Sequence, residues 1–160
     1  ITMIQRVQTL FLLGAIICLG LCAFFPIMTI EDNVMKIVID GFATKQLTKP
    51  EGVLIHQTSN IYLIGGVGLA ILIAGFSISQ YKNRVLQMKL GLINNFVILA
   101  VALVAVFVNI EQAKALLPSP ESVTYGLTGI LIFGAILLTR VANVFIKKDE
   151  DLVRSVDRIR

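Results

Sequence analysis

The sequence predicts an all-α membrane protein: a four-transmembrane-helix bundle, a small extracytoplasmic β-hairpin between helices 1 and 2, and a C-terminal cytoplasmic amphipathic helix. Two observations support this fold class. Four runs carry no charged residue, at 7–30, 52–81, 90–110 and 122–139. The composition is 56% hydrophobic, with a mean hydropathy of +0.86. A helix rises ~1.5 Å per residue and needs about 20 apolar residues to cross ~30 Å of hydrocarbon, so these runs predict spans.

We expect transmembrane helices at about 7–30, 58–81, 89–111 and 120–146, in a single membrane domain of residues 1–160. The periplasmic hairpin loop is expected at 31–57 and the cytoplasmic tail at 147–160. The first run is longer than the 7 to 15 residues of a signal-peptide core, so we interpret it as a retained helix. It carries Gly14, Cys18 and Cys22 four residues apart on one helical face.

The loop after this helix predicts the hairpin. The segments Val34–Ile39 and Phe42–Leu47 flank Asp40 and Gly41, and Asp-Gly between β-prone segments is typical of a two-residue type I′ turn. Because a lone two-stranded hairpin is marginal in water, we expect it to rest on the helices, the membrane surface or a partner.

Small and polar residues predict how the helices pack. Gly66, Ala70 and Ala74 form a second small-residue stripe, which allows close helix contact in lipid. Packing within one chain is the favoured interpretation, and homodimerisation is the alternative. Asn94 and Asn95 are expected to bond across helices or, less favourably, to form a binding site. Ser119-Pro120-Glu121 resembles an N-cap with a first-turn proline and acid, so the fourth helix is expected to begin there after a very short loop.

The charges predict the orientation. Ten basic residues fall on the side of the termini and second loop, and four on the other side; the ten are Arg6, Lys82, Arg84, Lys89, Arg140, Lys147, Lys148, Arg154, Arg158 and Arg160. The positive-inside rule therefore places both termini in the cytoplasm. Arg140 is expected to reach the cytoplasmic headgroups as an anchor.

The tail combines an apolar stripe with spaced charges. Leu152, Val156 and Ile159 share one helical face, and Glu150 and Arg154 are spaced for a side-chain pair. A solvated continuation of the fourth helix and docking on the bilayer or a partner are both open. We single out seven candidate partner contacts: Leu152, Arg154, Ser155, Val156, Asp157, Arg158 and Ile159.

Several chemistries have no support in the sequence. No Asp, Glu, Lys or Arg falls in the middle of an expected span, which argues against a proton-coupled exporter. His56 is the only histidine and the loops hold no cysteine, so a histidine-based metal or haem site and loop disulfide chemistry are not expected. No phosphate loop or nucleophile motif is present. We therefore expect no enzyme activity, cofactor, metal or nucleic-acid partner.

Both ends of the chain carry a pattern found in a known family. Met3-Ile4-Gln5-Arg6-Val7-Gln8-Thr9 and the segment from Lys148 to Arg160 resemble a family of uncharacterised four-helix membrane proteins of Bacteroidota. The resemblance covers the whole length. It implies a bacterial inner-membrane location and Met3 as the native start, and it implies no activity.

The function expected from these features is a non-enzymatic accessory or assembly subunit of a larger membrane complex, with membrane lipids around it. The alternative is a small transporter or lipid-handling protein, which predicts a polar or hydrated cavity at mid-membrane near Asn94 or Asn109. A claudin-like adhesion module matches only the loop plan, so it rests on topology alone.

Overall fold

The computed structural model describes the backbone of residues 2–117 and 120–157 and the side chains of 7–117 and 120–155. The described chain contains four helices and five strands. The helices are α1 (Thr2–Cys22), α2 (Ile61–Ser79), α3 (Arg84–Leu116) and α4 (Thr128–Asp157), and the strands are β1 (Pro26–Glu31), β2 (Met35–Asp40), β3 (Ala43–Thr48), β4 (Leu54–Ser59) and β5 (Ser122–Tyr125).

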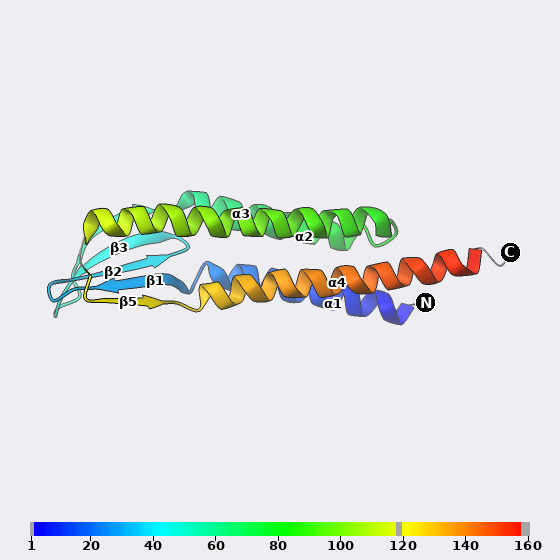
Figure 1. Cartoon of the computed structure of the whole chain (residues 1–160), viewed down its shortest axis with the longest axis horizontal. Helices are drawn as coiled ribbons and strands as arrows, with labels where there is room; N and C mark the ends of the chain where they lie inside the picture. Colours follow the sequence, from blue (N-terminus) through cyan, green and yellow to red (C-terminus); the bar gives the residue numbers. More distant parts are fainter. Residues whose placement is uncertain (1, 118–119, 158–160) are drawn as a thin grey trace.

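The five strands form one antiparallel sheet, in the order β4-β3-β2-β1-β5, at one end of the helices (Figure 1). The all-α fold class predicted from the sequence is therefore wrong. The expected hairpin exists as β2 and β3, but it is the centre of a larger sheet. The other strands were counted as helix or loop, because uncharged β-strands next to membrane spans look the same to hydropathy as the spans themselves.

The first helix ends eight residues before the expected boundary at 30. Helix α1 ends at Cys22, and Pro26 opens β1. Proline has no N–H to continue a helix, and it disfavours helical geometry at the residue before it. The strand stays free of charge up to Ile30 because Met28 and Ile30 are buried in the core.

The fourth helix does not begin at the predicted N-cap. Ser119 lies outside the described residues, and the segment that follows Glu121 forms β5 before α4 begins at Thr128. Glu121 N donates to Glu31 O at 3.1 Å, and β5 continues along β1 from Ser122↔Glu31 to Tyr125↔Met28. Pairing with a strand about ninety residues earlier in the chain outweighs the local capping signal.

The β2–β3 turn also differs from the expected type I′. Among the described residues only Gly52 has a positive φ, so Asp40 and Gly41 do not adopt the primed turn. Instead, Asp40 Oδ1 accepts from Phe42 N at 2.9 Å and from Ala43 N at 2.7 Å. These two hydrogen bonds to the carboxylate stabilise the turn, so it does not need the left-handed backbone conformation of a type I′ turn.

The helices lie in two antiparallel pairs, α1 beside α4 and α2 beside α3 (Figure 1). Three of them are long and apolar enough to cross a membrane: Ile61–Ser79, Arg84–Leu116 and Thr128–Ser155. The described apolar part of α1, Val7–Cys22, is shorter, so its crossing stays a prediction. The expected tail is not a separate helix, since α4 runs on to Asp157.

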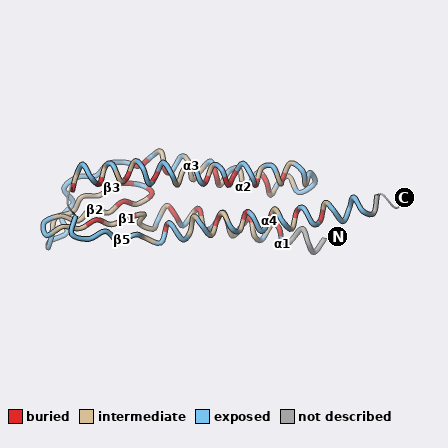
Figure 2. The backbone as a smooth tube through the Cα atoms, in the orientation of Figure 1, coloured by how far each residue is buried: buried red, intermediate tan, exposed pale blue. Residues whose placement is uncertain are grey.

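Helix α3 joins the helical part to the sheet. Its 33 residues make a helix ~50 Å long, which exceeds the ~30 Å of bilayer hydrocarbon. The C-terminal part of α3 extends past the other helices and packs against the sheet (Figure 1). Ala113 of α3 and Leu117, which follows the helix, contact the buried face of β1 and β2, formed by Met28, Ile30, Ile37 and Ile39. Buried residues accordingly follow the facing sides of the helices and continue into the sheet (Figure 2).

Candidate functional site

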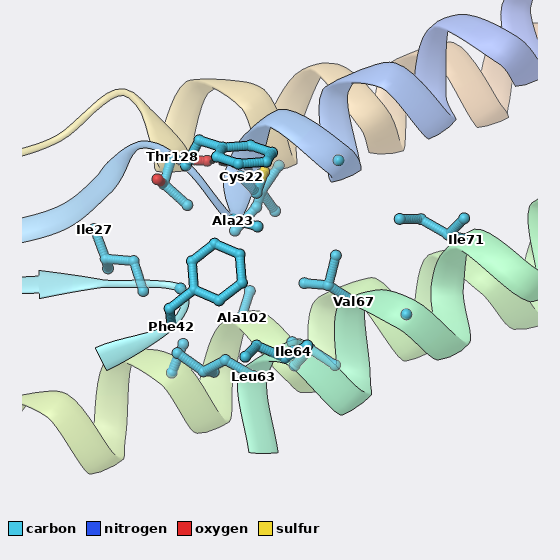
Figure 3. Close-up of a pocket in the computed structure, with 17 residues that line it drawn as sticks. Cys22, Ala23, Ile27, Phe42, Leu63, Ile64, Val67, Ile71, Ala102 and Thr128 are labelled. Carbon is cyan, nitrogen blue, oxygen red and sulfur yellow. Dashed lines mark hydrogen bonds between the residues drawn. The ribbon is translucent and has the colours of Figure 1, made fainter. Parts of the chain in front are cut away.

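A cavity of about 270 Å³ lies where the helices meet the sheet (Figure 3). We call it the junction pocket. Its walls come from the end of α1 (Gly20, Cys22), the link to β1 (Ala23, Phe24), the β2–β3 turn (Gly41, Phe42), the first half of α2, the middle of α3 and the start of α4. Five segments that are separate in the sequence therefore build one site.

The junction pocket is almost wholly apolar. The polar groups on its wall are the Cys22 thiol and the Thr128 hydroxyl, and both face backbone carbonyls: Cys22 Sγ lies 3.9 Å from Thr128 O, and Thr128 Oγ1 is 2.9 Å from Phe25 O and 3.0 Å from Pro26 O. A charged ligand would lose its hydration there with no compensating partner. The lining suits a hydrocarbon chain.

Two aromatic rings form the rim of the pocket. Phe24 is 75% exposed and Phe42 is 44% exposed. Their rings meet edge to face, with centroids 5.8 Å apart. In Figure 3, Phe42 stands between Ala23 on one side and Leu63 and Ile64 on the other. Because both rings reach the surface of the molecule, the pocket opens to its surroundings.

Small residues create the free space inside. A Cβ added at Gly20 or Gly68 would meet no atom within 4 Å, and Ala102 and Ala105 supply only methyl groups from α3. Larger side chains at the two glycines would extend into the cavity. The pocket volume therefore depends on residue size at a few named positions, which makes it accessible to mutation.

A buried polar residue fixes the turn that covers the pocket. Asn60 precedes α2 and is fully buried. Its backbone N–H donates to Phe42 O at 2.8 Å, and its side-chain amide donates to Asp40 O at 3.0 Å and to the Thr44 hydroxyl at 3.2 Å. Asn60 thus ties the start of α2 to the β2–β3 turn and holds Phe42 in place.

A comparison with protein families identifies the family of this chain. The model described as "Domain of unknown function (DUF4293)" matches residues 4–159. The chain belongs to the DUF4293 family. No functionally curated protein matches the sequence. The family resemblance carried by the two ends of the chain is confirmed, while its restriction to Bacteroidota stays a prediction.

In this DUF4293 protein, the small-residue stripes lie at helix contacts. A Cβ on Gly14 would be 3.2 Å from Leu138 Cδ1, and one on Gly134 would be 3.8 Å from Cys18 Sγ, so the α1 stripe faces α4. A Cβ on Gly66 would come within 2.5 Å of Val101 on α3. Ala70 and Ala74 are buried farther along α2. Of the predicted packing residues, only Cys22 lines the junction pocket.

The predicted amide residues Asn94 and Asn95 are buried in α3 and do not line the pocket. Neither side chain has a hydrogen-bond partner among the described residues. Asn109, nearer the sheet, accepts from the Tyr62 hydroxyl at 3.4 Å. The cross-helix bonding expected of Asn94 and Asn95 stays a prediction, and the junction pocket differs in its apolar lining from the polar cavity that the transport alternative predicted.

The predicted partner contacts of the tail lie at the opposite end of the molecule. Leu152, Arg154 and Ser155 are exposed on α4, which projects beyond the other helices (Figures 1 and 2). Arg154 Nε donates to Glu150 Oε1 at 2.9 Å. The side chains of Val156 and Asp157, and the whole of Arg158 and Ile159, lie outside the described residues. The described part of the tail continues α4 and contacts the start of α3 through the Arg84–Asp149 pair, and its docking on the bilayer or a partner stays a prediction.

The sequence interpretation missed the residues of the junction pocket. Gly20, Phe24 and Gly68 fell inside the expected helices, and Gly41 and Phe42 belonged to the expected hairpin, so none of them was named as a site residue. A signal was present in Phe24-Phe25-Pro26, where proline ends the helix and leaves an aromatic pair at the membrane boundary. Their convergence depends on long-range strand pairing, which the local pattern does not reveal.

Proposed function

We propose that this protein handles membrane lipid by binding a hydrocarbon chain in the junction pocket. The observation that carries the proposal is the apolar lining of an open cavity about 270 Å³ in volume. The wider assignment, a multi-pass protein of the bacterial inner membrane with the sheet outside, forms part of the proposal. The charge distribution supports the orientation, and the resemblance of the two ends of the chain supports the location.

The depth of the pocket supports a lipid ligand. Tyr62 on α2 contacts Asn109 on α3, and the 25 residues from Arg84 to Asn109 measure ~38 Å along the helix, close to the thickness of a bilayer with part of its headgroups. The pocket lies just inside this level, against Val101 and Ala105. A chain from the adjacent leaflet can enter past Phe24 without crossing water.

Filling the pocket tests the proposal. Gly68→Leu places an isobutyl group where a Cβ meets open space, and Gly65→Leu is the matched control, because Gly65 lies one turn away on α2, also has open space around it, and does not line the pocket. Wild type, Gly68→Leu and Gly65→Leu are reconstituted with a phospholipid that carries a photoreactive group on its acyl chain. Crosslinking to residues of the pocket wall is measured by mass spectrometry.

We expect Gly68→Leu to reduce crosslinking at least fivefold and Gly65→Leu to leave it unchanged. Gly20→Leu, which approaches the same space from α1, should act like Gly68→Leu. Equal labelling of the pocket wall in all four proteins would reject the lipid site. Far-ultraviolet circular dichroism of each variant verifies that the helices are intact.

A second function, a non-enzymatic accessory or assembly subunit, is supported by β4. This strand is one edge of the sheet, so one row of its backbone groups is unpaired. All six of its residues are exposed, and Val53, Leu54 and Ile55 are each about half exposed, at 54%, 50% and 53%. Leu54 lies seven residues before α2, or ~20 Å along an extended chain, so lipid contact does not explain this apolar surface.

The geometry of the edge favours a different chain over a second copy. The strands run roughly along the helix axes (Figure 1). An antiparallel β4–β4 pair is related by a two-fold axis perpendicular to the strands, which would invert the second copy with respect to the membrane. Two copies inserted in the same orientation cannot form this pair. The edge instead suits an extended apolar segment of another protein.

A charge on the edge tests this role. Ile55→Lys places a lysine on the free strand, and Val34→Lys is the control, because Val34 is also an exposed apolar residue and lies in the β1–β2 turn, away from this edge. A photoreactive residue replaces Gln57 in both backgrounds, and crosslinks are compared in native membranes. We expect a crosslinked protein that Ile55→Lys loses and Val34→Lys retains. The same crosslinks in both variants, or none in either, would reject the edge as a docking site.

A further inference from the structure

A basic residue lies deep in the helical region without a partner. Arg140 is on α4, twelve residues after Thr128 and seven before Lys147, which are ~18 Å and ~10 Å along the helix. Its side chain is exposed, and among the described residues it forms no ion pair or hydrogen bond. An arginine at such depth is costly in lipid unless an acidic or polar group meets it.

The direction of the side chain opposes the anchoring role expected from the sequence. Cα–Cβ bonds tilt toward the N-terminus of a helix, and for α4 that direction leads toward the sheet and away from Lys147. Arg140 lines a cavity of about 180 Å³ between α3 and α4, together with Ile136, one turn nearer the sheet, and Leu99. Arg140 therefore lines an open groove between α3 and α4, on the sheet side of Lys147.

A second unpaired polar group lines the same groove. Asn95 is 6% exposed, and neither its amide nitrogen nor its amide oxygen has a hydrogen-bond partner among the described residues. A buried amide without a partner has lost its hydrogen bonds to water and gained none in exchange, which destabilises the protein unless a ligand meets it. The groove thus holds a cation and an amide donor, both without partners, between the apolar walls of Phe96, Leu99 and Ile136.

We propose that this groove receives the carboxylate of an aspartate or glutamate in a transmembrane helix of a partner protein. The carboxylate pairs with the Arg140 guanidinium and accepts from the Asn95 amide, which reaches it by rotation about its side-chain bonds. Phe96 and Leu99, both exposed, pack against the partner helix. The inference rests on the accessory-subunit proposal for the existence of a partner, and it is independent of the junction pocket and of β4.

Depth favours a helix over a lipid headgroup as the source of the anion. Lipid phosphates lie at the membrane surface, and Arg140 Cα is ~10 Å along the helix from Lys147, with its side chain directed farther inward. A carboxylate on a helix can be placed at any depth. An anionic group at the level of Arg140 is therefore supplied more readily by a second protein chain.

The test uses defined synthetic helices. A leucine-alanine transmembrane peptide with one central glutamate is compared with the same peptide carrying glutamine, in phosphatidylcholine vesicles that contain the full-length protein. Energy transfer between the labelled peptide and the labelled protein reports association. We expect the glutamate peptide to bind at least tenfold more tightly than the glutamine peptide, and this comparison leaves the protein unchanged.

Variants of the protein locate the effect. Arg140→Gln should abolish the preference for glutamate, Arg140→Lys should retain part of it, and Asn95→Leu should reduce it severalfold. Arg154→Gln, which removes an exposed arginine from the tail of the same helix, should leave it unchanged. Equal binding of the two peptides, or a preference that persists in Arg140→Gln, would overturn the proposal.

A second experiment distinguishes a lipid phosphate from a helix carboxylate as the anion that binds Arg140. If phosphatidylglycerol in the vesicles displaces the glutamate peptide from wild type and a spin-labelled phosphatidylglycerol is immobilised by wild type but not by Arg140→Gln, the ligand is a lipid phosphate and the proposal is wrong. If wild type shows no preference for the glutamate peptide while the crosslinks that depend on Ile55 persist, this site is rejected and the accessory function stands.

Discussion

Two glycines are required for close backbone contact. A Cβ on Gly41 would lie 2.9 Å from Ala23 Cα, and a Cβ on Gly126 would lie 1.8 Å from Pro26 O. Gly126 N also donates to Ile27 O at 3.0 Å, which holds the segment after β5 against the start of β1. Neither contact can be relieved by a side-chain rotation, because the opposing atoms belong to the backbone.

We therefore expect Gly126→Ala to be strongly destabilising. Overpacking a tight site costs about 1–3 kcal/mol, and this contact requires backbone displacement, so the loss should reach the upper end of that range. Gly129→Ala is the control, because a Cβ there meets nothing within 4 Å. Thermal unfolding in detergent should show a large fall in midpoint for Gly126→Ala and no fall for Gly129→Ala. Similar midpoints would show that the β1–β5 contact is looser than described.

One carboxylate of the sheet has a strongly lowered pKa and should contribute to the acid dependence of its stability. Glu31 lies 2.9 Å from Lys36 Nζ and 2.8 Å from Lys49 Nζ, and the hydrogen bonds from these ammonium groups lower its pKa from 4.5 to about 2. A lowered pKa in the folded state stabilises above the unfolded value, and the stabilisation is lost as pH falls through the folded value. It should therefore decline between pH 4.5 and about 2.

The corresponding variant is Glu31→Gln. Its unfolding midpoint should fall less steeply than that of wild type as pH decreases through this range. Glu51→Gln, which removes an exposed carboxylate without an ion pair among the described residues, should follow the wild-type profile. Parallel profiles for wild type and Glu31→Gln would show that the Lys36 and Lys49 contacts do not persist in solution.

At the level of elements, an ion pair joins the start of α3 to the end of α4. Arg84 Nε lies 2.8 Å from Asp149 Oδ2, and both side chains are largely buried, at 15% and 6% exposed. Removing one member leaves an uncompensated charge, which costs about 3–5 kcal/mol for a buried pair. Arg84→Gln should therefore loosen α4 from Asp149 onward, and hydrogen exchange of 147–157 should accelerate.

The double variant Arg84→Gln/Asp149→Asn serves as the control, because it removes both charges. It should recover part of the stability lost in Arg84→Gln. If exchange in 147–157 is equally slow in wild type and Arg84→Gln, the end of α4 is held by other contacts. Gln87, one turn farther along α3, would then be the next residue to vary.

The helices were more predictable than the strands. The cores of α2, α3 and α4 fall inside the uncharged runs, and the hairpin around Asp40 and Gly41 appears as β2 and β3. Hydropathy could not separate β1, β4 and β5 from membrane spans. Strands β4 and β5 carry no charged residue, β1 carries none before Glu31, and each strand is followed or preceded by an apolar helix in the sequence. Pro26 was the local signal that distinguished β1 from α1.

The junction pocket was not predictable for a different reason. Its residues are unremarkable singly, and Phe24 and Phe42 meet only because β1 and β2 pair and α1 ends where β1 begins. The Arg140 groove was more predictable, since Arg140 and Asn95 are both polar residues of expected spans. Their shared cavity depends on the register between α3 and α4, which the sequence alone does not specify.

The whole molecule has two distinct ends. The sheet lies at one end, and the start of α1 and the projecting end of α4 lie at the other (Figure 1). Ten of the basic residues fall on the side of the termini, so the positive-inside rule predicts that the sheet lies outside the cytoplasm, as proposed above. The junction pocket would then take its lipid from the outer leaflet of the inner membrane.

Thiol labelling tests this orientation. In a background of Cys18→Ala/Cys22→Ala, single cysteines are introduced as Glu51→Cys in the β3–β4 turn and Arg154→Cys on α4, both exposed positions. A membrane-impermeant maleimide should label position 51 in intact spheroplasts and position 154 only after lysis. The opposite pattern would place the sheet in the cytoplasm, and the pocket would face the cytoplasmic leaflet. Arg140 would stay at the same depth in either orientation, so its need for a partner does not depend on the result.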